Sequence, residues 1–272
     1  DVTLSVTDND TSEVSYSPLS LVFGSGNWST SQVITLTGVD DNVSDGSQST
    51  LLTLTPSSSG DSKYNSSSLA QSLTTVTTDN DTVGLVLSKT TATLSESGTT
   101  DNFSVVLTSE PTATVTLTLS DNDSTEVSAT PSTLSFGSGN WSVAQWVTLT
   151  GKDDNVSDDN QTTLLTLTPS GGDYGSVSAQ TLTVTTSDND TVGLVLSKSS
   201  ALVSENGSVS DNFSVVLRSA PTANVTLTLS DNDSTEVTAS PTSLSFSSGN
   251  WSVALWITLT GKDDNVSDDN QT

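Results

Sequence analysis

The 272-residue sequence predicts an all-β protein built from tandem immunoglobulin-like antiparallel β-sandwich domains of about 110 residues. Thr alternates with Val and Leu, as in TVTLTL at 114–119, which is the period-two pattern of half-buried strands. The motif Asn-Trp-Ser recurs at 27–29, 140–142 and 250–252, and no stretch shows the 3.6-residue apolar period of a helix. Ser and Thr make up 100 of the 272 residues, but the alternation favours folded strands over a disordered stalk.

One complete repeat contains seven predicted strands, each a run of β-branched and apolar residues that ends in Ser, Gly, Asp or Asn turn signals. In chain order they are 83–88, 102–109, 114–120, 132–136, 145–151, 163–170 and 180–187. Because successive side chains point to opposite faces of a sheet, parity selects the core positions. These are Phe103, Val105, Leu107, Val115, Leu117, Leu119, Val147, Leu149, Leu165, Leu167, Leu182 and Val184.

The repeat spacing also predicts the domain boundaries. Residue 1 aligns with Thr114, and residue 272 aligns with Thr162. We therefore expect a partial repeat over 1–80 without its N-terminal strands, a complete repeat over 81–189, and a partial repeat over 190–272 without its C-terminal strands. This arrangement predicts a window on a longer tandem array, in which each repeat has neighbouring repeats as partners.

Composition excludes several classes of function. The net charge is −26, with only six Lys and Arg, so we expect no nucleic acid partner. No apolar run approaches the roughly 18 residues of a membrane span, so we expect no direct membrane insertion by this segment. Cys, His and Met are absent, and paired carboxylates recur in every repeat instead of converging once, so we do not expect an enzyme.

Carboxylates concentrate where predicted strands end. The stretch TLTGKDDNVSDDNQT at 148–162 returns at 258–272, and a variant stands at 35–49. Glu96 follows the first strand of the complete repeat, Glu126 precedes the NWS region, and Asp188 and Asp190 close the repeat. Loops that join alternate strands of a sandwich emerge at one end, so these acids supply the several oxygen ligands that calcium requires. The alternative is that they only solvate loop tips.

In these residues the sequence resembles the Calx-β repeats of large prokaryotic cell-surface and adhesin proteins. The similarity rests on the early Ser-Glu (Glu96 and Glu205), the segments TLSF and VTLTGKDDN, and the closing VTTSDND. It covers the whole chain, although each motif is short. The resemblance implies calcium-binding sandwich domains and a ligand set. In the complete repeat this set is Glu96, Glu126, Asp153, Asp154, Asp158, Asp188 and Asp190, and in the partial repeats it is Asp40, Asp41, Asp45, Asp79, Asp81, Glu205, Asp263, Asp264 and Asp268.

The sequence departs from the strongest calcium binders of that family at two positions. Asn155 stands where such binders carry a third acid, and Gln161 stands where Glu is common. Fewer charged ligands predict weak sites, with dissociation constants of about 10⁻⁴–10⁻³ M.

All 18 Asn residues lie in Asn-x-Ser/Thr sequons, which predicts N-linked glycans on a secreted surface. The candidate sites are Asn27, Asn42, Asn65, Asn102, Asn140, Asn155, Asn160, Asn206, Asn212, Asn224, Asn250 and Asn265. Three further Asn residues lie within acidic loops, where they are alternatively turn formers or carbonyl ligands. They are Asn80, Asn122 and Asn189.

The tryptophans fall into two classes. Trp141 of the NWS motif is expected to cover the rim of the sandwich. Trp146 and Trp256 alternate with core positions and are therefore expected to point outward, either beneath a glycan or against another chain, whereas the first repeat has Val33 there.

The function that these features predict is a structural stalk or extracellular fibre of a prokaryotic cell surface, stiffened by calcium at the domain ends and N-glycosylated. The alternative is an adhesive module that binds carbohydrate or protein through its loops and outward tryptophans. Lateral self-association of chains into a filament is a third possibility, because each contact would recur with the repeat.

Overall fold

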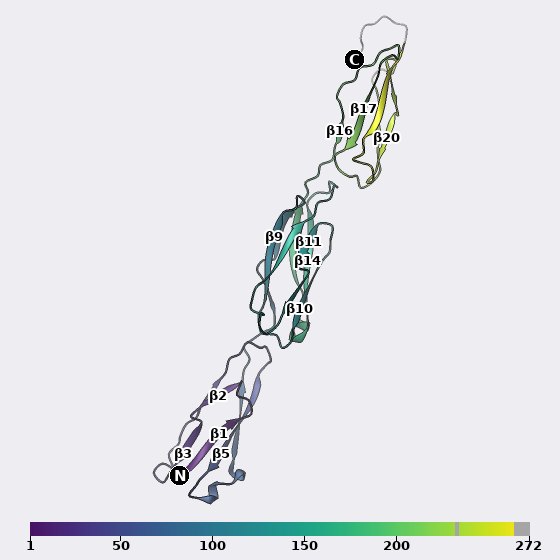
Figure 1. Ribbon diagram of the computed structural model, residues 1–272. Helices are drawn as coiled ribbons and strands as arrows, with labels where there is room; N and C mark the ends of the chain where they lie inside the picture. The colour runs from purple at the N-terminus through teal and green to yellow at the C-terminus, as the bar shows by residue number, and fades with distance from the viewer. Residues whose placement is uncertain (232–233, 264–272) are drawn as a thin grey trace.

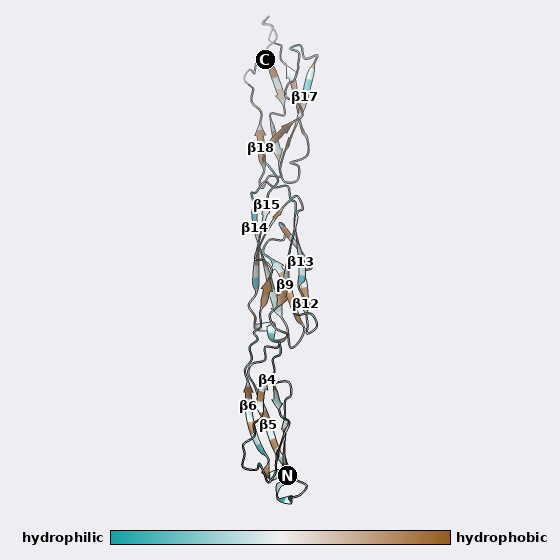
Figure 2. Ribbon diagram, turned by 90° about the vertical axis from the view of Figure 1, so that its left-hand side faces the viewer, coloured by the Kyte–Doolittle hydropathy of each residue, from teal (hydrophilic) through white to brown (hydrophobic). Residues whose placement is uncertain are grey.

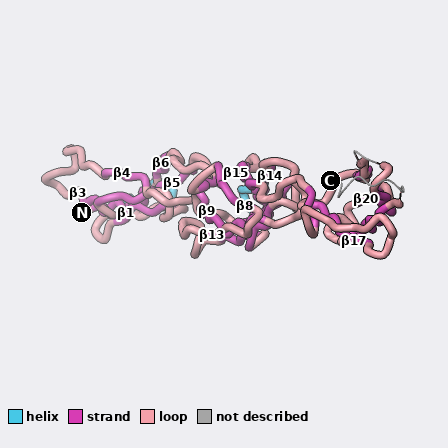
Figure 3. Tube along the Cα trace, turned by 90° about the horizontal axis from the view of Figure 1, so that it is seen from above, coloured by secondary structure: helices cyan, strands magenta, loops and turns pink. Residues whose placement is uncertain are grey.

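The computed structural model describes residues 1–231 and 234–263, which form three β units arranged end to end in an elongated molecule (Figure 1). Strands and loops make up nearly all of this molecule, with a few short helical turns (Figure 3). Apolar residues concentrate on the strands (Figure 2). The predicted class, tandem β-sandwich units, is therefore confirmed. Within the described residues, no helix has both the length and the apolar character that crossing a membrane requires.

The middle unit is a sandwich of two sheets, with strand orders β12-β10-β14-β15-β8 and β11-β13-β9-β7. Its strands are β7 (Leu85–Leu87), β8 (Thr91–Ser95), β9 (Thr100–Leu107), β10 (Val115–Asp121), β11 (Val127–Thr130), β12 (Thr133–Phe136), β13 (Gln145–Gly151), β14 (Gln161–Ser170) and β15 (Gln180–Ser187). The seven predicted strands are all present, and β8 and β11 are two strands that the sequence pattern did not indicate. All pairs are antiparallel except β8 with β15, which is parallel.

The core of the middle unit follows the predicted parity. All twelve predicted positions have exposed fractions of 8% or less. Ala92 and Leu94 of β8 join them, as does Tyr174 of the 3₁₀ segment η3 (Gly172–Ser176). The Tyr174 hydroxyl donates a hydrogen bond to the Ser109 carbonyl at 2.8 Å and accepts one from the Ser109 amide at 3.0 Å. This buried polar group is therefore fully paired, as burial requires.

The outer units contain parts of the same sandwich. The first has sheets β3-β1-β5-β6 and β2-β4, and the third has sheets β16-β17-β21-β19 and β18-β20. The first unit consists of β1 (Val2–Asp8), β2 (Val14–Ser17), β3 (Ser20–Phe23), β4 (Thr35–Gly38), β5 (Gln48–Ser57), η1 (Ser62–Tyr64), η2 (Ser67–Leu69) and β6 (Gln71–Thr77). The third consists of β16 (Leu194–Leu196), β17 (Ser210–Leu217), β18 (Val225–Thr228), β19 (Val237–Ser240), β20 (Ser243–Phe246) and β21 (Leu255–Gly261). Their buried clusters are smaller than that of the middle unit.

Adjacent units are joined by the backbone of one repeated loop. The Asn42 carbonyl accepts a hydrogen bond of 2.6 Å from the Glu110 amide, and Val43 forms a parallel β-bridge with Glu110. At the second junction the Asn155 carbonyl accepts a bond of 2.6 Å from the Ala220 amide. A cleft of about 410 Å³ beside this second bond is lined by residues of both units. The loop that carries the acidic motif therefore also contacts the next unit.

Candidate metal centre

Carboxylates from four chain segments meet at the end of the middle unit that faces the third unit. They form two overlapping groups, in each of which one oxygen per residue lies within 4.8 Å of the others. One group is Glu96, Asp188 and Asp190, and the other is Glu96, Glu126 and Asp154. Glu96 belongs to both groups, so five acids surround one region of space.

The parallel pairing of β8 with β15 places Glu96 in this cluster. Ser95 is in register with Ser187, and the Glu96 amide donates to the Ser187 carbonyl at 3.2 Å. The Glu96 side chain then accepts a hydrogen bond of 3.2 Å from the Asn189 amide. The second and last strands of the unit, β8 and β15, are thus brought together at the position where the acids collect.

Gly151 allows the exit of β13 to approach β8. A Cβ atom at this position would lie 2.3 Å from the Ser95 carbonyl oxygen, so any side chain would displace backbone. Gly261 in the third unit has the same relation to the Ser204 carbonyl oxygen, also 2.3 Å. The Gly of the GKDD motif therefore permits the close approach that sets the acidic loop beside Glu96.

Two of the clustered glutamates are buried. Glu96 is 1% exposed and Glu126 is 3% exposed. Oε2 of Glu126 and Oδ2 of Asp190 are buried and accept no hydrogen bond from the described residues. A buried carboxylate oxygen without a partner is costly, because its desolvation is not compensated. A cation bound here would supply the partner that these two oxygens lack.

Burial and mutual repulsion also disfavour the ionised form of the acids in this cluster. Burial, followed by the charges of Asp158 and Glu96, raises the pKa of Glu126 to about 7. Burial also raises the pKa of Glu96 and that of Asp190, with neighbouring carboxylates adding to both effects. Lys152 leaves the same strand as the acidic loop, but its ammonium group donates to the Ser124 carbonyl. Positive charge would relieve the mutual repulsion of these acids.

The remaining acids of the loop shape the site. Asp188 Oδ2 accepts hydrogen bonds of 3.1 Å from the amides of Asp158 and Asp159. Asp153 Oδ1 accepts a bond of 3.0 Å from the Asn189 side chain. Asp159 has a φ of 67°, a left-handed conformation that Gly46 occupies in the first unit with a φ of 77°. Asp188 therefore ties the closing segment of the unit to the acidic loop.

The first unit contains a related acidic cleft. Its predicted ligands all line a cavity of about 480 Å³, namely Asp40, Asp41, Asp45, Asp79 and Asp81. Glu13, 8% exposed, lies in the same cleft, and burial followed by the charge of Asp45 raises its pKa. Glu13 was not among the predicted ligands, although a Glu-Val pair recurs in every repeat, at Glu13, Glu126 and Glu236. This recurrence in the sequence could have identified Glu13 as a candidate ligand.

The third unit brings fewer of its predicted acids together. Glu205, the counterpart of Glu96, is exposed, and so is Asp263. Neither belongs to a metal-type group within residues 1–231 and 234–263. Asp264 and Asp268 lie outside the described residues, as does the sequon Asn265.

The predicted glycosylation sites differ in what their side chains do. The Asn of each NWS motif closes its turn with two hydrogen bonds, in which Oδ1 accepts from a backbone amide and Nδ2 donates to a backbone carbonyl. These residues are Asn27, Asn140 and Asn250. Asn65, Asn160 and Asn206 accept hydrogen bonds from nearby donors. A third group has exposed side chains whose amides make no hydrogen bond within the described residues. This group is Asn42, Asn102, Asn155, Asn212 and Asn224.

The Asn residues of the acidic loops hold those loops together. Asn80 donates to Asp40, and Asn189 donates to Asp153, each at 3.0 Å. Asn122 accepts a bond of 2.5 Å from the Leu164 amide. In this structure these three side chains therefore link separate segments of the chain by hydrogen bonds.

The tryptophans also separate as their positions predict. Trp141 is half-buried against the core, and Trp251 is its equivalent in the third unit. Trp28 differs, since it is 73% exposed. Its unit has no counterpart of β9, the strand whose Leu107 amide donates to the Trp141 carbonyl. Trp146 and Trp256 point outward and are 61% and 57% exposed.

Comparison with known proteins identifies fold likeness only. No protein-family model matches the chain, and no curated protein matches its sequence. The calcium binding domain CBD12 of CALX1.1 is similar in structure, with a TM-score of 0.32 and 18% identity, over 66% of this chain and 76% of that one. Domains 4–9 of the surface layer protein SbsC give a TM-score of 0.34 and 10% identity, over 97% of this chain and 35% of that one. SSP-19 of Caenorhabditis elegans gives a TM-score of 0.27 and 12% identity, over 38% of this chain and 97% of that one. Scores this low assign the chain to none of these families.

Proposed function

We propose that the chain is a structural tandem-repeat stalk or extracellular fibre of a cell surface, stiffened by calcium at the ends of its units. The observation that carries the proposal is the dual role of the acidic loop. Asp154 of this loop belongs to the carboxylate cluster, and Asn155, the next residue, bonds the backbone of the following unit. A cation that orders the loop would therefore also order the junction.

The donor set favours calcium over other metals. All candidate ligands are carboxylate oxygens, and the sequence has neither Cys nor His, which softer transition metals prefer. Five acids on four segments supply up to ten oxygens in irregular geometry, which suits the six to eight ligands of calcium better than the strict octahedron of magnesium. The ion would neutralise the buried oxygens of Glu126 and Asp190 and bring the β8, β13 and β15 exits together.

The stalk proposal also follows from the shape and charge of the molecule. The molecule has three units in a row and a net charge of −26, and acidic loops lie at its junctions. Because these carboxylates repel one another, a stalk without a bound cation would be weakly ordered at each junction. The proposed location is extracellular and prokaryotic, where free calcium is in the millimolar range that weak sites need. Lateral association of chains into a filament stays a prediction.

A calcium titration of the 272-residue chain tests this function. Thermal unfolding and the radius of gyration are followed together from EDTA to about 10 mM calcium. We expect the midpoint of the middle unit to rise by about 6–20 °C at about 10 mM calcium, because a ligand at about 10–100 times its dissociation constant adds about 1.4–2.7 kcal/mol. The radius of gyration should rise as the junctions straighten.

Two variants make the titration specific. Glu126→Gln keeps the shape of the side chain and removes its charge, so it should lose most of the calcium response while folding at least as well in EDTA. Asp121→Asn removes one exposed carboxylate outside both groups and should respond like the parent chain. Equal loss in both variants, or no response of the parent chain in either measurement, would contradict the proposal.

The second candidate function is an adhesive module that binds carbohydrate or protein. The exposure of Trp146 and Trp256 favours it, since single large aromatics on a polar face are typical binding residues. Trp146→Ala combined with Trp256→Ala should then abolish binding to a glycan array without changing calcium stabilisation. Retained binding would remove this candidate.

A further inference from the structure

Each of the two outward tryptophans lies beside an unengaged sequon on the neighbouring strand. Trp146 of β13 is directly opposite Ser104 of β9, and Thr148 is opposite Asn102. Asn102 is therefore the diagonal neighbour of Trp146 on the outer face of the sheet. Diagonal neighbours are about 7–8 Å apart, within reach of an indole and one sugar ring.

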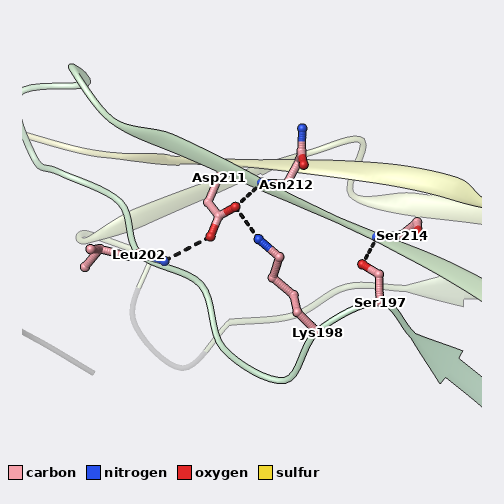
Figure 4. Close-up of polar contacts among 6 residues, drawn as sticks. All are labelled: Ser197, Lys198, Leu202, Asp211, Asn212 and Ser214. Carbon is pink, nitrogen blue, oxygen red and sulfur yellow. Dashed lines mark hydrogen bonds and ion pairs between the residues drawn. The ribbon is translucent and has the colours of Figure 1, made fainter.

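The third unit repeats this arrangement. Trp256 of β21 is opposite Ser214, and Thr258 is opposite Asn212 of β17. Figure 4 shows the Asn212 side chain pointing away from the ion pair of Lys198 and Asp211, while only its backbone amide contacts Asp211. Two units of the chain thus pair an exposed Trp with a free Asn amide in the same register.

We propose that Asn102 and Asn212 carry N-linked glycans and that Trp146 and Trp256 are the platforms on which the first sugar of each glycan stacks. Both Asn side chains are exposed, and their amides make no hydrogen bond within the described residues. The glycosylated amide keeps one hydrogen and loses no existing contact. The apolar face of a pyranose ring covers the indole, while its hydroxyl groups stay in water.

The modification needs a sugar donor, which is a lipid-linked oligosaccharide pyrophosphate, and a transferase. Nδ2 of the Asn forms a bond to the anomeric carbon of the first sugar, and the bond from that carbon to the pyrophosphate oxygen breaks. One amide proton is released, and the lipid pyrophosphate leaves. No oxidation or reduction is involved.

A sugar is a better occupant of this face than a second copy of the chain. Each chain carries a net charge of −26, so lateral approach of two copies is opposed by repulsion, whereas a neutral saccharide meets none. Around the indole, Ser104, Asn102 and Thr148 are polar and suit a wet, hydroxyl-rich partner, whereas Val106 on the opposite diagonal is apolar and half-buried. The occupant is also tethered, so its effective concentration is high.

The first experiment is site occupancy by peptide mass spectrometry, on the full chain produced in a host that modifies Asn-x-Ser/Thr sequons. We expect Asn102 and Asn212 to be occupied. If both are bare while Asn42 or Asn155 is modified, the transferase was active and the inference is wrong. This proposal rests on glycosylation and not on calcium, so the calcium titration can fail or succeed independently of it.

The second experiment tests the stacking. Trp146→Ala with Trp256→Ala should lower the melting temperature of the glycosylated chain by about 3–8 °C and leave the unglycosylated chain within about 1 °C. Asn102→Gln with Asn212→Gln should red-shift tryptophan emission, whereas Asn224→Gln, which removes an exposed sequon elsewhere, should not. Equal effects of the Trp variants with and without glycans would overturn the proposal. So would concentration-dependent association that the Trp variants abolish, because the occupant would then be a second chain.

Discussion

The middle and third units share the segment VGLVLSK, then diverge from TTATLSE to SSALVSE, and they fold this diverging segment differently. In the middle unit residues 91–95 form β8, with Leu94 2% exposed and Glu96 1% exposed. In the third unit the equivalent residues form no strand, Val203, the counterpart of Leu94, is only half-buried, and Glu205 is exposed. Both units keep the same ion pair between a Lys and an Asp, Lys89 with Asp101 and Lys198 with Asp211 (Figure 4).

The difference lies in the partner strand. In the middle unit Thr93 is paired with Thr185 of β15. The third unit has no counterpart of β15 within its described residues, and the Leu202 amide donates to the Asp211 carboxylate instead (Figure 4). In the middle unit this strand is therefore held by its parallel pairing with β15. Because Glu96 follows β8 directly, the buried part of the acidic cluster depends on that pairing as well.

This dependence predicts a large loss of stability when Leu94 is shortened. Leu94→Ala should cost the middle unit about 2–4 kcal/mol, because it empties a fully packed position. Val203→Ala at the equivalent half-buried position of the third unit should cost less than about 1 kcal/mol. Urea unfolding followed by hydrogen-exchange mass spectrometry resolves the units. Equal losses in the two units would show that the third unit forms this strand too.

Gly151 provides a sharper comparison among all three units. Gly151→Ala and Gly261→Ala each place a methyl group 2.3 Å from a backbone oxygen and should cost about 1–3 kcal/mol. In the first unit Gly38→Ala meets only a Thr77 methyl group at 3.2 Å, so its cost should stay below about 0.5 kcal/mol. The same unfolding measurement checks this order. A costly Gly38→Ala would mean that the close approach does not explain the glycine.

The acidic cluster predicts a pH dependence in the absence of calcium. The pKa of Glu126 is raised from 4.5 to about 7 in the folded chain, so the folded state holds its proton more tightly than the unfolded state does. Its contribution to stability is complete below about pH 4.5 and is lost as the pH rises through about 7. The shift is worth about 3 kcal/mol at full strength and about 1–2 kcal/mol with solvent screening.

Thermal unfolding at pH 5 and pH 8 in EDTA measures this loss, which Glu126→Gln should largely abolish. Calcium should reverse the trend at pH 8, because the bound ion favours the ionised carboxylates. A parent chain that is more stable at pH 8 than at pH 5 in EDTA would show that the carboxylate of Glu126 is not strained in this way.

Sequence periodicity predicted the fold well and the site only in part. Alternation identified every core position tested, because parity within a strand is a local property. It could not identify β8, because TATLS is short and polar and becomes a strand through its parallel contact with β15. Glu13 was missed for a similar reason. Its burial results from long-range packing, which no spacing within one loop reports.

A smaller change in stability is expected at the left-handed residue of the acidic loop, where the first and middle units differ. Asp159 has a φ of 67°, and Gly46 has a φ of 77° at the same place. Glycine adopts this conformation without strain but loses more entropy on folding. Asp159→Gly also removes one of several like charges, so it should stabilise the calcium-free middle unit by up to about 1 kcal/mol.

The reciprocal change, Gly46→Asp, should destabilise the first unit by a similar amount, and urea unfolding in EDTA measures both. If Asp159→Gly instead weakens the calcium-free unit, the exposed carboxylate stabilises the loop by itself. Asp159 would then act in the fold of the loop and not in the repulsion that calcium is proposed to relieve.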